Sequence, residues 1–343
     1  MKFPTETPPE MLAFLGKNLD REQAETPLLL ETGDALPELP AGSEGLAGIV
    51  NLQRLNDIRY INKFLESVNR NLRPGGYFAG CSETALRRKE RFLAQYPRTL
   101  GKLLYAFDFL LVRVWPKLPY LRGSYFALTQ GQNRVISEME TYGRLYSCGF
   151  KLIDSAELGG KLYFLAEKTG EPAYNMEATY GPLIKLRRVG KNGKMMKVLK
   201  FRTMSPYSEY IQQFIYERNG YDGGDNFRDD TRITTLGKFM RKYWIDELPM
   251  LWNLLRGDLK LFGVRPVSAH YLSLFPEEFQ EYRKKFKPGL IPPVYVEIPK
   301  TFDEIHEVER RYLEAYEKAP LTTDIRYFAR AFYNIFIKRI RSS

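Results

Sequence analysis

Short apolar runs and one helical stripe alternate along the first part of the chain. Ile49–Leu55 and Tyr77–Cys81 are apolar runs of strand length, and each predicts a strand. Between them, residues 58–71 carry apolar side chains at helical spacing, which predicts an amphipathic helix. Arg73-Pro74-Gly75-Gly76 is typical of a turn into the second strand. A strand, a helix and a strand in this order favour an α/β fold.

Two more apolar runs follow at Gly149–Ile153 and Leu162–Ala166, and Gly159-Gly160 between them predicts a strand pair. Residues 1–45 differ, because they are acidic and rich in proline. We expect this stretch to be a poorly packed leader with one short helix at Met11–Asn18. Residues 46–175 are then the first folded domain.

Gly101–Tyr120 is the most apolar segment of the chain, but Asp108, Arg113 and Pro116 interrupt it. It falls short of the roughly 18 uninterrupted apolar residues of a spanning helix, so we expect no full transmembrane span. Two interpretations stay open. The segment is either an interfacial or re-entrant element at a membrane or a helix buried between two domains.

In residues 176–343 the pattern changes to polar residues at fixed spacing. Residues 194–204 alternate like a strand, which places Lys200 and Arg202 on one face. Residues 190–193, Gly-Lys-Asn-Gly, are typical of a hairpin turn before that strand. A helix is predicted at Lys238–Tyr243.

Asp246 is predicted to cap the next helix, whose apolar spacing ends at Gly257. Capping alone explains many acidic residues in this position, so a purely structural role stays open. A capping carboxylate is expected to remain ionised because backbone N–H groups favour its charged form. Such a carboxylate can attack phosphorus if cations offset the repulsion between two anions. The candidate cations are Lys200, Arg202, Arg241 and Arg265.

Composition adds a net charge of +11, from 52 Lys and Arg against 41 Asp and Glu. Eight basic residues and no acidic one lie between Lys185 and Arg202, and five basic and no acidic ones lie from Ile325 to the end. Such runs favour a phosphate ligand, a lipid headgroup or nucleic acid, although a solvated face is the simpler alternative. Two cysteines and two histidines support neither a disulfide framework nor a His-rich zinc site.

Three segments resemble the bacterial sugar transferase family: GPLIKLRRVGKNGKMMKVLKFRTM at 181–204, DDTRITTLGKFMRKYWIDELPMLWNLLRGDLKLFGVRP at 229–266, and KPGLIPPVYV at 287–296. The resemblance covers about residues 180–300. Members of this family are monotopic polyprenyl-phosphate phosphoglycosyl transferases that start exopolysaccharide, O-antigen and glycan assembly.

The resemblance implies roles for individual residues. Asp246 would be the nucleophile that attacks the β-phosphorus of a UDP-sugar and releases UMP, with Glu247 as its catalytic partner. Mg²⁺ would bind beside Asp246, and undecaprenyl phosphate would then take the sugar phosphate. The phosphate site would be lined by Lys200, Arg202, Arg241 and Arg265. Four further matches, for which we expect structural roles, are Asp230, Arg232, Asn253 and Pro266.

The chain also departs from the family. The family's hydrophobic re-entrant helix directly precedes the Gly-Pro segment, whereas Gly101–Tyr120 lies about sixty residues before Gly181. Val264 replaces the first proline of the usual Gly-Pro-Arg-Pro. Residues 324–341 predict a basic amphipathic helix that lies at an anionic membrane or packs on its own domain. Its apolar stripe comprises Ile325, Phe328, Phe332, Ile335 and Phe336.

Residues 46–168 resemble the C-terminal half of a class I methyltransferase-like Rossmann domain. No G-x-G-x-x-G loop follows a strand there, so we expect no adenosyl cofactor and a scaffold or docking role. The expected fold is therefore α/β: a truncated, non-catalytic Rossmann-like domain is followed by an α+β phosphoglycosyl transferase domain at residues 176–343.

The expected function is transfer of sugar-1-phosphate from a nucleotide sugar to polyprenyl phosphate. The expected place is the cytoplasmic face of the bacterial inner membrane, in peripheral or monotopic form. The alternative is a catalytically weak scaffold that docks other glycan-assembly proteins. Nucleic acid is not an expected partner, because the sequence contains no recognisable nucleic-acid module.

Overall fold

The computed structural model describes residues 7–19, 26–40, 44–118, 120–174, 180–219 and 230–338. The chain divides into two compact units. The first comprises Met1–Gly181 with Ser205–Glu217, and the second comprises Pro182–Met204 with Arg218–Ser343. This division differs from the predicted boundary at residue 175, because the chain returns to the first unit after its excursion through residues 182–204.

The first unit is built on a five-stranded sheet with the order β1-β2-β3-β5-β4. Strands β1 to β3 run parallel, and β5 is antiparallel to both β3 and β4. Helix α2 (Ile61–Asn71) connects β2 to β3, which makes the β-α-β element of a Rossmann-like fold. The predicted strands and helix are confirmed, as is the mixed α/β class. The strands are β1 (Leu28–Leu30), β2 (Leu46–Arg54), β3 (Leu72–Ser82), β4 (Phe150–Leu158) and β5 (Lys161–Lys168).

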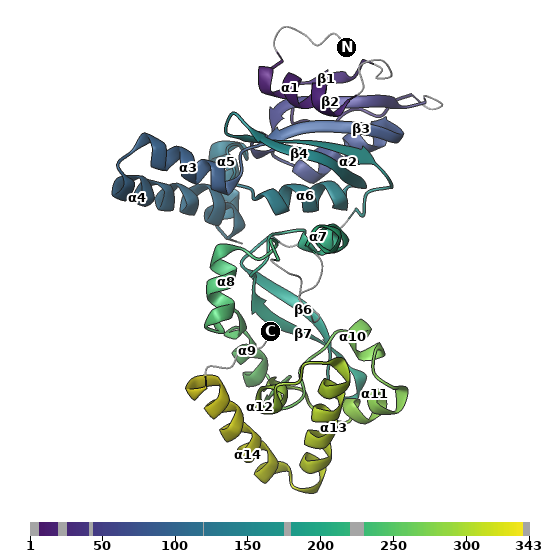
Figure 1. Ribbon diagram of the computed structural model, residues 1–343, viewed down its shortest axis with the longest axis vertical. Coiled ribbons are helices and arrows are strands. Elements are labelled where there is room, and N and C mark those ends of the chain that lie inside the picture. The colour runs from purple at the N-terminus through teal and green to yellow at the C-terminus, as the bar shows by residue number, and fades with distance from the viewer. Residues whose placement is uncertain are drawn as a thin grey trace. The chain divides into compact units, whose positions relative to one another are not determined.

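Helices cover both faces of this sheet (Figure 1). On one face, α2 and α6 (Glu138–Ser147) pack their apolar sides against Phe78 and Phe164. On the other face lies α1 (Pro9–Asn18), whose Met11, Phe14 and Leu15 are fully buried against the sheet. The expectation of a poorly packed leader is therefore wrong for this helix. Three apolar side chains on one helical face are enough to close the sheet.

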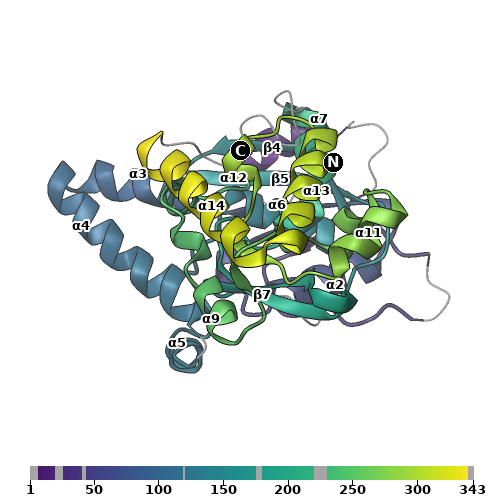
Figure 2. The same ribbon diagram turned by 90° about the horizontal axis from the view of Figure 1, so that it is seen from below.

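A helical hairpin extends from the first unit between β3 and α6 (Figure 2). Its helices are α3 (Ala85–Gln95) and α4 (Arg98–Phe109). The chain continues through η2 (Leu110–Val114), η3 (Trp115–Lys117) and α5 (Arg122–Thr129). The apolar segment Gly101–Tyr120 thus forms most of α4 and the turns after it. The short η5 (Ser208–Ile211) and α7 (Gln212–Asn219) follow much later in the chain.

The second unit starts with the antiparallel hairpin of β6 (Leu183–Val189) and β7 (Met195–Phe201). Asn192 and Gly193 adopt positive φ in the connecting turn, as the predicted hairpin turn requires. A second, parallel pair is formed by β8 (Lys260–Phe262) and β9 (Gly289–Ile291). The other elements are α8 (Thr235–Lys242), η6 (Ile245–Glu247), α9 (Met250–Leu255), α10 (Ala269–Ser273), α11 (Glu277–Lys284), α12 (Val294–Glu297), α13 (Phe302–Lys318), α14 (Pro320–Phe332) and η7 (Tyr333–Ile337).

The C-terminal helix splits its predicted apolar stripe between core and surface. Phe328 and Ile335 pack on the aromatic core of the unit, whereas Ile325 and Phe332 are exposed. Lys260 links this helix to the core by bonding both Tyr312, at 2.8 Å, and Asp324. The predicted helix 324–341 corresponds to α14 and η7, which end at Ile337, and Arg339, Arg341 and the side chain of Phe336 lie outside the described residues.

Among the described helices, none combines the length and the apolar character needed to cross a bilayer.

Candidate active site

Asp246 lies in a tight 3-10 turn, η6, directly after a residue in left-handed conformation. Trp244 has a φ of 53°, and the Glu247 N–H donates to its carbonyl oxygen at 3.2 Å. The next helix, α9, starts at Met250 and has Pro249 as its N-cap. Asp246 is therefore not a helix cap, and that prediction is wrong. Asp246 lies inside η6, whereas a cap would have to lie directly before the first residue of α9.

Burial is the main influence on the Asp246 carboxyl group. The residue is 9% exposed, and its Oδ1 is a buried atom with no hydrogen-bond partner. Desolvation raises the pKa of Asp246, Lys200 opposes that rise, Glu247 adds to it and Arg241 opposes it. This direction is opposite to the one expected from helix capping. A buried carboxylate oxygen that accepts no hydrogen bond from the protein is poorly stabilised as an anion, so it is better placed to act as a nucleophile or metal ligand than a capped one.

Lys200 binds the second carboxylate of the site. Its Nζ lies 2.6 Å from Oε1 of Glu247, and both side chains are partly buried. The register of β6 and β7 places Lys200 on the same face as the buried Val198, which packs against α9. The predicted strand is confirmed as far as Phe201, but Arg202, which was predicted to share the face of Lys200, lies beyond its end. Lys200 and the Asp246–Glu247 turn meet because β7 and η6 are neighbours.

Arg241 approaches Asp246 from helix α8. Its Nε donates to Oγ1 of Thr203 at 3.0 Å, just beyond the end of β7. Burial lowers the pKa of Arg241, and the nearby Asp246 counteracts this. Helix α8 lies so close to the chain at Thr203 that a Cβ on Gly237 would come within 2.0 Å of the Thr203 carbonyl oxygen. Because glycine has no Cβ, helix α8 can pack this close to Thr203, and this packing positions Arg241.

Arg265 and Arg188 extend the cationic side of the site. Arg265 is exposed, and its charge contributes to lowering the pKa of both Arg241 and Arg188 after the larger effect of burial. Cations that disfavour one another in this way are expected where an anion binds. Arg188 was not predicted as a site residue. It pairs with Met196 across the hairpin, and Met196 lies on the same face of β7 as Lys200, so strand alternation could have identified it.

Arg202 follows the last residue of β7, and its N–H donates to the Pro182 carbonyl oxygen at 2.6 Å. This bond holds Arg202 at the open end of the hairpin. Of the predicted phosphate-binding residues, Lys200 and Arg241 each counteract the rise in the pKa of Asp246, and Arg265 contributes to lowering the pKa of Arg241.

The matched residues for which we expected structural roles make structural contacts. Asn253 clamps α9 to β7, because it accepts from the Leu199 N–H at 2.9 Å and donates to the Lys197 carbonyl oxygen at 2.8 Å. Asp230 and Arg232 form a two-bond ion pair of 2.8 and 2.7 Å. Both arrangements support the chain on either side of the Asp246 turn.

Within the described ranges, no three His, Cys, Asp or Glu side chains come together as a ready metal site. The donor chemistry at Asp246 nevertheless suits Mg²⁺, which takes one or two carboxylates and completes its shell with water and substrate phosphates. The Asp246 oxygen without a partner is an available ligand of that kind.

Comparison with known proteins finds relatives for most of the second unit. Residues 173–338 match the model of the family described as bacterial sugar transferase. These residues are therefore similar to that family over slightly less than half of the chain. Identity reaches 40% over 112 residues with galactosyl transferase CpsE of Streptococcus agalactiae, 38% over 109 residues with exopolysaccharide production protein ExoY of Sinorhizobium fredii, and 32% over 144 residues with undecaprenyl-phosphate galactose phosphotransferase of Salmonella typhimurium.

These alignments cover only parts of the proteins. They span 32%, 30% and 40% of this chain and 25%, 48% and 28% of the three relatives, so less than half of each relative has a counterpart here. Among solved structures, a putative methyltransferase from Bacillus halodurans matches 39% of this chain and 74% of its own at 9% identity, with a TM-score of 0.24. A score this low carries no argument, so the class of the first unit rests on its strand order.

Proposed function

We propose that the second unit transfers sugar-1-phosphate from a nucleotide sugar, with UDP as the nucleotide, to polyprenyl phosphate. The observation that carries the proposal is the buried Asp246 oxygen without a partner, placed where Lys200 and Arg241 act on it. This arrangement lies in the part of the chain that matches the bacterial sugar transferase family. A relative named undecaprenyl-phosphate galactose phosphotransferase supports the choice of acceptor.

In the first step, an oxygen of Asp246 attacks the β-phosphorus of the donor. A phosphorus–oxygen bond forms, the bond to the α-phosphate oxygen breaks, and UMP leaves with that electron pair. The cations Lys200, Arg241, Arg265 and Arg188 offset the charge of the diphosphate as the anionic carboxylate approaches. The product is a phosphosugar-aspartate on Asp246.

In the second step, a phosphate oxygen of the polyprenyl phosphate attacks the phosphorus of that intermediate. The bond to Asp246 breaks, the free carboxylate returns, and polyprenyl diphosphate-sugar leaves. Glu247, held by Lys200 at 2.6 Å, keeps the Lys200 ammonium group beside the reacting carboxyl group in both steps. One site thus serves donor and acceptor in turn.

Mg²⁺ completes the proposal as a cofactor. Asp246 would hold it through the oxygen that has no protein partner, with Glu247 next to it in the same turn. When bound, the ion supplies positive charge to the donor phosphates. Removal of divalent cations with EDTA is expected to abolish transfer, and added Mg²⁺ is expected to restore it.

The acceptor's lipid tail requires an apolar surface near Asp246, and the neighbouring helices offer one. The exposed apolar side chains on α8 are Leu236 and Phe239, and those beside and on α9 are Leu248, Leu251, Trp252 and Leu255. Side chains of this kind bind at the boundary between headgroups and acyl chains. We therefore propose that the second unit acts at the cytoplasmic membrane face; none of its described helices is long and apolar enough to span a bilayer.

A reconstituted assay tests the proposal. The protein is incubated with Mg²⁺, a panel of UDP-sugars and undecaprenyl phosphate in vesicles, and lipid products are identified by mass spectrometry. We expect polyprenyl diphosphate-sugar and UMP in equal amounts with the wild type and with Asp303→Asn, an exposed control in α13. We expect neither product with Asp246→Asn. No product from any sugar of a broad panel would favour the scaffold alternative instead.

A further inference from the structure

The Arg265 side chain is exposed, so its place in the second unit depends on its main chain. Among the described residues, no hydrogen bond or ion pair holds the Arg265 guanidinium group. The chain leaves β8 through Gly263 and Val264, which are both buried, and it continues into Pro266. The position from which Arg265 can reach an anion is therefore set by the groups that bind the main chain of residues 263–267.

Donors from three other segments bind that main chain. The N–H groups of Val189 and Gly289 each donate, at 2.9 Å, to a carbonyl oxygen on either side of Arg265. The third donor is a side chain, because the guanidinium group of Arg283 in α11 donates to the carbonyl oxygen of Arg265 itself. The residue that carries the exposed cation is thus held directly by a second arginine.

Arg283 is itself held by a buried carboxylate. It is 4% exposed, and it donates to both oxygens of Glu309 in α13, at 2.7 and 3.2 Å. A buried ion pair often stabilises a fold no more than apolar side chains of similar volume would. Apolar side chains, however, could not donate to the Arg265 carbonyl oxygen, and a charged donor makes that bond stronger than a neutral one. The pair therefore favours a role in placing Arg265 over one in stability alone.

Arg265 is close enough to the candidate active site for its placement to matter there. Its positive charge contributes, after the larger effect of burial, to lowering the pKa of Arg241, and Arg241 in turn counteracts the rise in the pKa of Asp246. A cation that must meet a diphosphate tolerates little displacement, since an error of about 1 Å can cost about 100-fold in rate.

We propose that Arg283, held by Glu309, is a positioning residue of the donor site. Its bond to the Arg265 carbonyl oxygen fixes where the Arg265 guanidinium group meets the diphosphate of the nucleotide sugar. Neither Arg283 nor Glu309 contacts the substrate. This inference rests on the function proposed above, and it makes α11 and α13 the support of one of the phosphate-binding cations.

A mutant cycle in the full-length protein tests this inference. Arg283→Met together with Glu309→Met removes both charges, so that neither stays buried without its partner. This pair of substitutions is made in the wild type and in Arg265→Ala, and UMP release is measured against donor concentration. If Arg283 acts through Arg265, the pair lowers kcat/KM for the donor about tenfold in the wild type and less than about twofold in Arg265→Ala.

Tyr282→Phe is the matched control. It removes another hydrogen bond between α11 and α13, from the Tyr282 hydroxyl to Glu317 at 3.1 Å, but leaves the bond to Arg265 in place. We expect its kcat/KM to equal that of the wild type. A structural role would give equal losses from the Arg283 and Glu309 substitutions in both backgrounds. That result, or no loss in the wild type, would overturn the inference.

Calorimetric titration with UDP and Mg²⁺ measures the same cycle without turnover. The dissociation constant of UDP is expected to rise about tenfold with the paired substitutions in the wild type and to change less than about twofold in Arg265→Ala. A wild type that binds UDP but releases no UMP from any sugar would contradict the proposed function, and the titration would still decide the role of Arg283. A wild type that does not bind UDP would contradict both.

Discussion

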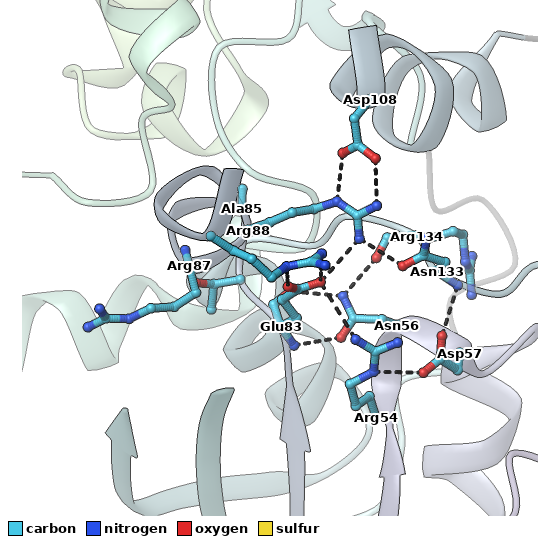
Figure 3. A network of polar contacts seen from close by, with 12 residues as sticks. Arg54, Asn56, Asp57, Glu83, Ala85, Arg87, Arg88, Asp108, Asn133 and Arg134 are labelled. Atoms are coloured by element: carbon cyan, nitrogen blue, oxygen red, sulfur yellow. Dashed lines mark hydrogen bonds and ion pairs between the residues drawn. The ribbon is translucent and has the colours of Figure 1, made fainter. Parts of the chain in front are cut away.

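Two clusters of buried charge in this protein differ in how well they are satisfied. In the first unit, Arg88 is 3% exposed and donates to Asp108, Glu83 and Asn133 (Figure 3). In the second unit, Asp246 is nearly as buried, yet its Oδ1 has no partner. The Arg88 guanidinium group bonds to other side chains of the protein, whereas one oxygen of Asp246 remains available to a ligand.

The pKa shifts of the two clusters express the same difference. Burial alone would lower the pKa of Arg88, but the bonds to Asp108 and the field of Glu83 outweigh it, so the charged form is stabilised. For Asp246, burial outweighs Lys200 and Arg241, and the pKa rises. A buried charge with all its partners supports structure, whereas one that lacks partners indicates a site that a substrate or metal completes.

Removing the Asp246 charge should produce the largest effect in the comparison. Asp246→Asn is expected to lower UMP release by at least about 10³-fold, because the nucleophile is lost. The protein should remain folded, since the replaced carboxylate was a destabilising buried charge. Activity and thermal unfolding measured on one preparation check this. A variant that loses activity only because it unfolds would contradict it.

Removing Arg88 from the cluster in the first unit should lower the stability of the protein rather than its activity. Arg88→Ala leaves Asp108 and Glu83 without their buried partner, and it is expected to destabilise the first unit by about 3–5 kcal/mol. Urea unfolding followed in the full-length protein measures this. Arg98→Ala, an exposed position at the start of α4, serves as the control and should change stability by less than about 0.5 kcal/mol. Equal losses in the two variants would show that the network does not hold the hairpin.

Lys200→Met tests the role of the cation beside Asp246. It removes the cation that opposes the rise in the pKa of Asp246 and the partner of Glu247. We expect transfer to fall about 10- to 100-fold, with the acid limb of the pH profile moved to higher pH. Lys200→Arg should recover part of the activity because it keeps the charge. An unchanged acid limb would contradict the assigned role of Lys200.

The smallest predicted effect is a dependence of stability on pH. The pKa of Asp246 is higher in the folded state than its ordinary value of 3.8, so its protonated form favours folding. That contribution is fully present below the unfolded pKa and is lost as pH rises through the folded one. The stability of Asp246→Asn relative to the wild type should therefore increase as the pH rises from below 3.8 through the folded pKa of Asp246. Parallel stability curves for the two proteins would refute this.

Sequence patterns predicted the strands of the five-stranded sheet well, because β2, β3 and β5 contain continuous runs of buried residues that read as apolar runs in the sequence. Lys200 was assigned to the correct face by period 2 alone, and the turn at residues 190–193 by its glycines. The local shape around Asp246 was not predictable in this way. The left-handed conformation of Trp244, which precedes the 3-10 turn that contains Asp246, has no signature in a non-glycine residue, so the sequence could not distinguish this turn from a helix start.

Helical stripes were equally ambiguous, since the same spacing suits a core and a membrane. Phe328 turned out to pack inward and Ile325 outward on one helix. For α1, the Pro-rich surroundings obscured a short stripe that the sheet buries. Whether such a stripe is buried depends on which surfaces the other elements of the fold leave uncovered. The sequence of the helix alone does not contain that information.

The central claim is that Asp246 itself carries the phosphosugar. Incubating the protein with Mg²⁺ and a UDP-sugar labelled at the β-phosphate, without lipid acceptor, tests it directly. The account predicts a protein mass increased by one phosphosugar, label on the peptide that contains Asp246, one UMP released per adduct, and loss of the adduct when polyprenyl phosphate is added. UMP released only in the presence of the lipid, with no label on the protein at any time, would contradict it.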